Sequence, residues 1–155
     1  MRGELSRRGF SVDECTRAMG MSLRDVPPPL EDLDLDLAPA DWAEYVRYLE
    51  HVGAPAGLLA GADPAAFHLL LARVAGTVAA TALAFDHDGD CGVFNVSTVE
   101  AVRRRGLGTA LTARLLRDAV NRGCATASLQ STAMAERVYA AVGFRDLGRI
   151  LEFVP

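Results

Sequence analysis

The chain has 155 residues, a length typical of a single domain. Half of its residues are apolar and 23% are charged, which is the composition of a globular protein. The formal net charge of -4 gives no reason to expect binding to nucleic acid or to an anionic membrane. No apolar stretch reaches the roughly 18 residues of a membrane-spanning helix, and the first residues lack the apolar centre of a signal peptide.

The three cysteines, Cys15, Cys91 and Cys124, form no close pair and have no metal-ligand spacing. An odd number of cysteines without a secretion signal indicates reduced thiols and a cytoplasmic location. We expect all three to be small buried apolar residues.

The first residues resemble a segment near the C-terminus. Residues 5–10 (Leu-Ser-Arg-Arg-Gly-Phe) and residues 139–144 (Tyr-Ala-Ala-Val-Gly-Phe) both read as the end of a helix followed by Gly-Phe, and a strand can follow each. Chance explains such a match. The alternative is that residues 1–26 are the tail of a preceding, degenerate copy of the same fold. In either case we expect residues 1–31 to be an N-terminal extension of a domain over 32–155.

Residues 27–66 are less regular. The run of prolines at 27–29 is typical of a linker, and leucines alternate with aspartates over 33–37, the pattern of an edge strand. Pro39 and Asp41 predict the start of a helix that carries Trp42, Tyr45, Val46 and Leu49. Residues 55–62 are compatible with a second short helix.

Residues 67–99 predict three antiparallel strands. The strands cover residues 67–74, 77–85 and 91–99, with turns at Ala75–Gly76 and Asp86–Asp90. The second turn superficially resembles a calcium loop, but Ser97 stands where the twelfth-position glutamate would be, so we expect no metal.

After residue 99 the apolar period changes from two to about 3.6, which indicates helix. Leu107, Leu111, Leu115, Ala119 and Val120 are expected to form the buried face of a helix that ends at Gly123.

A strand over 125–129 follows, and then a second helix with Thr132 as its N-cap and a core face of Ala135, Val138 and Val142. Gly143 is expected to end this helix, and residues 144–154 to be extended. Strand, helix and strand after a meander predict an α/β (α+β) fold.

The segment Asn95–Ala110 carries the chemistry. A strand runs into a glycine-rich turn that opens a helix, whose first backbone N–H groups lack partners and carry the positive end of the dipole. Gly106 and Gly108 leave those N–H groups open to an anion such as a pyrophosphate, and the neighbouring arginines add charge-assisted hydrogen bonds. A P-loop requires Lys-Ser/Thr where Thr109–Ala110 stand, and the dinucleotide fingerprint requires a small residue where Leu111 stands.

Two motifs carry a family resemblance. Residues 103–108 (Arg-Arg-Arg-Gly-Leu-Gly) resemble the Gln/Arg-x-x-Gly-x-Gly/Ala signature of the GNAT N-acetyltransferases, and residues 135–144 resemble that family's Ala-x-x-x-Tyr-x-x-x-Gly-Phe segment. The resemblance covers residues 32–155. It implies a GNAT fold, in which a central mixed, mostly antiparallel sheet with flanking helices is splayed at its middle and acetyl-CoA lies in the splay.

The resemblance also implies which residues hold acetyl-CoA. The strand before the signature pairs with the pantetheine arm in this family, and the turn binds the pyrophosphate. Thr132 stands where many members have an asparagine, which puts its contact in doubt. The implied residues are Val96, Ser97, Thr98, Arg103, Arg104, Arg105, Gly106, Leu107, Gly108, Thr109 and Thr132.

Tyr139 matches the family's general acid, which protonates the thiolate that leaves the thioester. Packing alone is the alternative role for this side chain. Many relatives have a glutamate as base on the strand before the last helix, but residues 125–129 contain no carboxylate. Ser128, Asn95, Glu100 or a water chain remain as candidates for the relay.

We therefore expect direct acetyl transfer from acetyl-CoA to a primary amine of unknown identity. Two alternatives stay open: a degenerate domain that binds acetyl-CoA as a sensor, and the scaffold half of a tandem protein. We expect no partnership with nucleic acid or membrane, and leave a homodimer open. Residues 10–24 are predicted to supply the strand that the fold lacks beside residues 149–154.

Overall fold

The computed structural model describes residues 2–26, 28, 37 and 40–155, and every structural statement below concerns these residues. The strands are β1 (Ser11–Ser22), β2 (His68–Val74), β3 (Thr77–His87), β4 (Asp90–Thr98), β5 (Thr126–Ser131) and β6 (Arg145–Val154). The α-helices are α1 (Arg2–Arg7), α2 (Trp42–His51), α3 (Leu107–Asn121) and α4 (Glu136–Val142). Short 3-10 turns lie at Leu23–Asp25, Ala56–Leu59, Pro64–Ala66 and Glu100–Val102.

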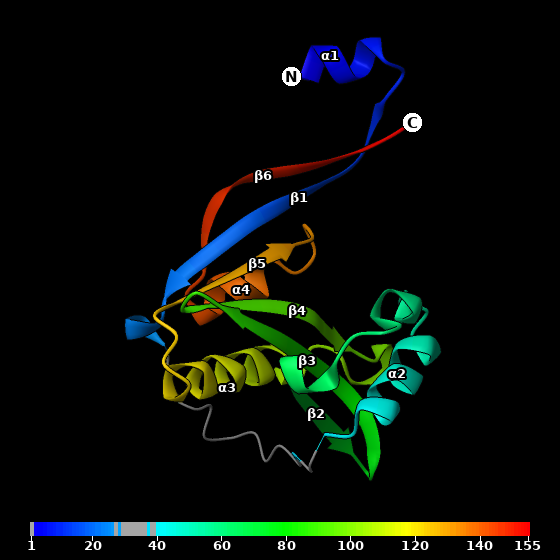
Figure 1. The fold of residues 1–155 in the computed structure, drawn as a ribbon. Helices are drawn as coiled ribbons and strands as arrows, with labels where there is room; N and C mark the ends of the chain where they lie inside the picture. Colours follow the sequence, from blue (N-terminus) through cyan, green and yellow to red (C-terminus); the bar gives the residue numbers. More distant parts are fainter. Residues whose placement is uncertain (1, 27, 29–36, 38–39) are drawn as a thin grey trace.

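The six strands form one sheet in the order β2-β3-β4-β5-β1-β6 (Figure 1). All neighbouring strands are antiparallel except β4 and β5, which are parallel. The predicted meander of β2, β3 and β4 and the predicted α/β class with a mostly antiparallel sheet are confirmed.

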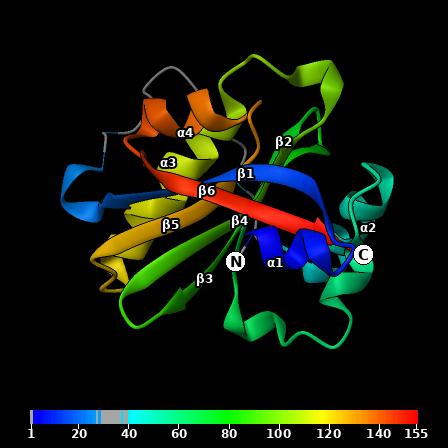
Figure 2. The ribbon, with the colours of Figure 1, turned by 90° about the horizontal axis from the view of Figure 1, so that it is seen from above.

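The N-terminal strand β1 lies between β5 and β6, far from its neighbours in sequence. It pairs with β5 from Arg17 to Ser22 and with β6 along nearly all of its length, as Figure 2 shows. The prediction that residues 10–24 supply a strand beside 149–154 is confirmed. β1 and β6 extend beyond β5 as a two-stranded ribbon that ends at α1 and the C-terminus (Figure 1).

The sheet opens between β4 and β5. Their pairing covers only Asp90–Val93 against Thr126–Leu129, although β4 continues to Thr98 and β5 to Ser131. Asn95 has a φ of 46°, and the pairing of β3 with β4 shifts register between Thr81 and Leu83. Such a bulge bends a strand, and here it turns β4 away from β5. The predicted splay at the middle of the sheet is confirmed.

Two apolar clusters fill the two faces of the sheet. α3 and α4 cover one face, where Leu111 and Leu116 pack with Ala82 and Tyr139. α2 covers the other face of β2 and β3. Asp41 caps α2 as predicted, since its carboxylate accepts a hydrogen bond from the N–H of Ala43 at 3.1 Å.

Three details of the sequence prediction were wrong. Val120 is 44% exposed, because it is turned about 100° from Ala119 around the helix and only Ala119 faces the sheet. Cys15 is exposed, unlike Cys91 and Cys124, because the first half of β1 lies beyond β5. Thr132 is not a helix N-cap: its carbonyl closes a turn with the N–H of Ala135, and α4 begins only at Glu136.

Other elements differ in length or lie outside the described residues. The second front helix is reduced to the 3-10 turn Ala56–Leu59, and the second hairpin turn contracts to Asp88–Gly89, both with positive φ. Of the edge strand expected over 33–37, residues 33–36 lie outside the described part of the chain, as do Pro27, Pro29 and Pro39. Leu37 is described and is not in a strand.

The end of α3 is tied to the meander by one ion pair. Arg122 donates to both carboxylate oxygens of Asp86, at 2.6 and 3.0 Å, and both side chains are 23% exposed. These hydrogen bonds lower the pKa of Asp86. The pair contributes stability that is present above the ordinary carboxyl pKa near 4 and is lost as the pH falls through the lower folded-state pKa.

We expect Asp86→Asn to lower the free energy of unfolding by about 1–2 kcal/mol at pH 7, because it removes the bidentate, charge-assisted hydrogen bonds from Arg122. Urea denaturation at pH 7 and at pH 3 measures this, and the difference from the native chain should shrink at pH 3. Asp118→Asn is the control, since Asp118 pairs with Arg114 on the exposed surface of the helix, where such pairs contribute little. Equal effects of the two changes would contradict the assignment.

Candidate acetyl-CoA site

The turn before α3 contains two residues with left-handed backbone conformation. Gly106, at the N-cap of α3, has a φ of 80°, and Arg104 has a φ of 64°. Both angles are left-handed, a region in which a side chain is strained and which glycine adopts freely. The turn therefore brings several successive N–H groups to the start of the helix.

These N–H groups are without partners. From Arg104 to Thr109, no backbone N–H donates a hydrogen bond within the described part of the chain, whereas the N–H of Ala110 donates to the carbonyl of Gly106 at 2.9 Å. α3 has 15 residues, so the positive end of a full helix dipole adds to this site. Free N–H groups at a helix start bind phosphate groups.

The arginines take two different positions. Arg103 folds back, and its Nε donates to the carbonyl of Thr98 at 3.0 Å, which ties the turn to the end of β4. Arg104 and Arg105 are exposed beside the free N–H groups. Gly108 faces β4, where an added methyl group would meet Val96 and Thr98 at 3.8 Å.

Val96, Ser97 and Thr98 lie on the part of β4 that has left β5. On the other side they stay next to β3, with Ser97 opposite Thr81 and Thr98 opposite Ala80. One edge of this segment is therefore free to pair with an extended ligand, as an added strand does.

Two tyrosines of α2 contact the same segment. The hydroxyl of Tyr48 donates to Ser97 Oγ at 3.0 Å, and Asn95 Nδ2 donates to the hydroxyl of Tyr45 at 3.0 Å. Burial raises the pKa of both tyrosines, so both stay neutral at physiological pH. Sequence reasoning missed Tyr48, although its spacing of three from Tyr45 puts both on one helix face.

Tyr139 lies on the buried face of α4 and is 7% exposed. Its ring packs edge-on against Phe144, with centroids 5.9 Å apart. Its hydroxyl has no hydrogen-bond partner among the described residues and is not sealed from solvent. Burial raises the pKa of this hydroxyl, which keeps its proton available at neutral pH.

The remaining candidates are more dispersed. Thr132 is exposed in the turn between β5 and α4, and Glu100 is exposed in the turn after β4. Ser128 donates to the carboxylate of Asp90 at 2.6 Å, at the end of β5 that is still paired with β4. Asn95 alone of the proposed relay groups lies on the open part of β4.

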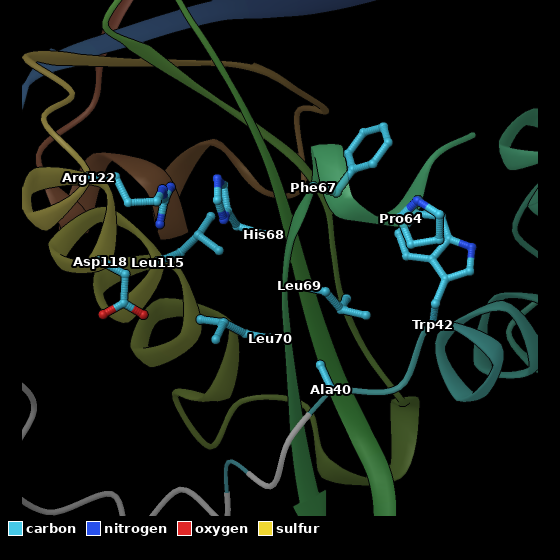
Figure 3. A pocket seen from close by; sticks show the side chains of 10 residues that line it. All are labelled: Ala40, Trp42, Pro64, Phe67, His68, Leu69, Leu70, Leu115, Asp118 and Arg122. Atoms are coloured by element: carbon cyan, nitrogen blue, oxygen red, sulfur yellow. The ribbon is translucent and has the colours of Figure 1, made fainter.

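A separate hollow of about 420 Å³ borders β2 (Figure 3). His68 and Leu70 of β2 and Arg122 at the end of α3 lie on one side of the sheet, and Trp42, Phe67 and Leu69 lie on the other. None of the residues expected to hold acetyl-CoA lines it.

Two classes of feature are absent from the part of the chain that is described. No group of three or more His, Cys, Asp or Glu side chains there can hold a metal ion. No helix among those residues is long and apolar enough to cross a membrane.

Comparison with known proteins identifies the family. The model of the acetyltransferase (GNAT) family matches residues 28–144, and the chain therefore belongs to the GNAT acetyltransferase family. The sequence has no match among curated proteins.

Solved structures share the fold. A GCN5-related N-acetyltransferase from Kribbella flavida matches with a TM-score of 0.76 and 22% identity over 99% of this chain and 62% of its own. One from Sphaerobacter thermophilus matches with a TM-score of 0.73 and 19% identity over 98% of this chain and 54% of its own. The ribosomal-protein-S18-alanine N-acetyltransferase from Escherichia coli matches with a TM-score of 0.59 and 22% identity over 69% and 75% of the two chains. This chain thus spans less than two thirds of the first two structures.

The two glycines of the turn should respond in opposite ways to alanine. Gly106→Ala should lower the free energy of unfolding by about 1–2 kcal/mol, because it forces a side chain into the left-handed region. Gly108→Ala should leave stability unchanged or raise it by up to about 1 kcal/mol, since the methyl group finds ordinary contacts in a helix. Thermal or urea unfolding of both variants measures this, and a tolerated Gly106→Ala would contradict the conformation described.

Proposed function

We propose that this domain transfers an acetyl group from acetyl-CoA to a primary amine, directly and within one ternary complex. The observation that carries the proposal is the run of N–H groups from Arg104 to Thr109 without partners, at the open end of the splay. A pyrophosphate fits such a run by charge and by hydrogen-bond geometry. Arg104 and Arg105, both exposed, would add charge-assisted hydrogen bonds, and Arg103 bonds the carbonyl of Thr98 at the end of β4.

Val96, Ser97 and Thr98 would hold the extended arm of acetyl-CoA along the free edge of β4. Gly108 adds no side chain of its own to the space between α3 and this edge, where Val96 and Thr98 already have side-chain atoms. Thr132 is exposed at the far side of the opening and offers a hydroxyl. When bound, acetyl-CoA supplies an activated thioester.

Tyr139 would donate its proton to the thiolate sulfur as the amine replaces it. Its hydroxyl suits this role because it is neutral and has no protein partner in the described chain. An N–H of β4 near Val96 or Ser97 would polarise the acetyl carbonyl. The proton that the amine loses would be relayed along a path that includes Asn95, whose side chain donates a hydrogen bond to the hydroxyl of Tyr45.

The acceptor amine would approach on the side of α2. Tyr45 and Tyr48 close that side of the opened strand with two neutral hydroxyls, already bonded to Asn95 and Ser97. The three free thiols fit a reducing compartment, and we place the reaction in the cytoplasm.

Binding without transfer is a second candidate, favoured by one observation. β5 itself carries no carboxylate. The carboxylates that bond its side chains come from other strands: Asp90 of β4 accepts from Thr126 and Ser128, and Glu152 of β6 accepts from Gln130. A general base on β5 is therefore missing, and a domain that senses acetyl-CoA needs none.

Calorimetric titration with acetyl-CoA tests whether the N–H groups from Arg104 to Thr109 bind its pyrophosphate. We expect one-to-one binding that Gly108→Ala weakens about tenfold, an expected loss of about 1.4 kcal/mol, because the methyl group occupies the space beside β4. Gly57→Ala is the matched control, since Gly57 lies in a distant turn with nothing within 4 Å of the added carbon. A folded chain without affinity for acetyl-CoA would remove both candidate functions.

The variant Tyr139→Phe tests the role of Tyr139 as the general acid. We expect kcat to fall about 100-fold or more while the Kd for acetyl-CoA stays the same, because only the proton donor is lost. Release of free CoA thiol in the presence of an amine panel measures kcat. The raised pKa implies that the native enzyme keeps its acid form as the pH rises to about 10, so this group should cause no loss of kcat below that pH. Unchanged turnover in Tyr139→Phe would exclude this role.

A further inference from the structure

The two ends of the chain carry the same local structure. α1 is followed by Gly9, with a φ of 86°, and by Phe10, whose N–H donates to the carbonyl of Leu5 at 3.0 Å. α4 is followed by Gly143, with a φ of 115°, and by Phe144, whose N–H donates to the carbonyl of Tyr139 at 3.1 Å. A long strand follows each, β1 or β6. The helix, Gly-Phe pair and strand at the N-terminus thus form one unit, and those at the C-terminus form a second. A residue of the first unit and its counterpart in the second differ by 134 in number, as do Gly9 and Gly143.

The pairing of β1 with β6 has a two-fold axis that follows this correspondence. Thr16 pairs with Ile150, which is its own counterpart, so the axis passes through this pair. The other pairs occur as symmetry mates: Cys15–Leu151 with Arg17–Arg149, Glu14–Glu152 with Ala18–Gly148, Val12–Phe153 with Met19–Asp146, and Ser11–Val154 with Gly20–Arg145.

Even the irregularities of this ladder are symmetric. One register shift skips Asp13 in β1, and the other skips Leu147 in β6. These two residues are counterparts. A chance repeat of helix, Gly-Phe and strand accounts for two similar chain ends, but it does not require matching bulges. Two copies of one structural unit, paired about a two-fold axis, produce them automatically.

We propose that α1 and β1 are the last helix and the last strand of a preceding copy of the GNAT fold in the same protein, and that the two copies exchange these strands. β1 then completes the sheet described here, between β5 and β6. β6 in turn completes the sheet of the preceding copy.

The outer edge of β6 is the surface that receives the preceding copy. The second half of β1, from Arg17 onward, pairs on its outer side with β5. By the two-fold axis, β6 offers the same edge from Leu151 onward to the counterpart of β5. A second copy of this chain cannot fill that place, because its own β5 is already paired with β4 on one side and with β1 on the other.

Burial along the two strands agrees with this assignment. Thr16 and Met19 of β1 are buried in the domain described here, with 3% and 4% of their surface exposed. Their counterparts Ile150 and Phe153 are apolar but only half-buried, and Val154 is 39% exposed. Apolar side chains thus stand uncovered where symmetry places the core of the preceding copy. α1 and the C-terminus lie together at this end of the ribbon (Figure 1).

The solved structures leave room for such a copy. The structures from Kribbella flavida and Sphaerobacter thermophilus match 99% and 98% of this chain, including the region of α1 and β1, with only 62% and 54% of their own lengths. One consequence, which rests on the proposed function, concerns activity. Leu5 is the counterpart of Tyr139, so the preceding copy lacks the proton donor and the protein has one transfer site.

The first test is the size of the protein in its source cells. An antibody raised against residues 67–155 should detect a product of roughly twice the 16.5 kDa of this chain, and the reading frame upstream of Met1 should encode a second unit of similar size. A product of 16.5 kDa with no coding frame upstream overturns the proposal, and so does a homodimer of that product. Neither result bears on acetyl-CoA binding, which the titration measures separately.

The second test uses the longer protein and asks where β6 lies. Phe153→Ala should lower the melting temperature of the longer protein by several degrees, because the side chain fills the core of the preceding copy. The same change in the 155-residue chain should have little effect. Arg145→Ala is the control, since its counterpart Ser11 is exposed and Arg145 is exposed as well. Equal shifts from Phe153→Ala in both proteins would overturn the exchange.

Discussion

The rest of the structure depends on how briefly β4 and β5 are paired. They share four residue pairs, Asp90–Val93 with Thr126–Leu129, and then the left-handed backbone of Asn95 turns β4 away. β5 does not follow, because β1 pairs with it as far as Ser131. An opening between two strands exposes backbone groups that a continuous sheet would satisfy, and these groups are what an extended ligand needs.

The helix start at Leu107 acts together with this opening. Arg103 bonds the carbonyl at the end of β4, so the turn, the strand edge and the helix dipole converge on one place. On the opposite side, Tyr45 and Tyr48 bond Asn95 and Ser97 and fix the bulged strand from α2. The site is therefore a backbone site, surrounded by neutral hydroxyls and a few cations.

The sheet is completed by the most distant pairing in the chain. β1 joins β5 and β6 across more than a hundred residues of sequence, and Arg17 forms an ion pair with Glu136 at 3.0 Å and a second one with Asp146. The N-terminal segment thus holds the two elements that flank Tyr139. If β1 belongs to a preceding copy, the geometry of this site depends on that copy as well.

The sequence by itself determined the local elements and the glycine-rich turn before α3. Apolar periods, the Asp41 cap, the glycines at 106, 108 and 143 and the two family motifs act through neighbours a few residues apart, and most of what they predicted is present. Only the tertiary structure decided the exposure of Cys15 and Val120, the late start of α4 beyond Thr132 and the contacts of Tyr48 and Ser128. The exposures and the side-chain contacts depend on which strand or helix covers a residue, and that element comes from a remote part of the chain. The late start of α4 instead follows from the turn that the carbonyl of Thr132 closes with the N–H of Ala135.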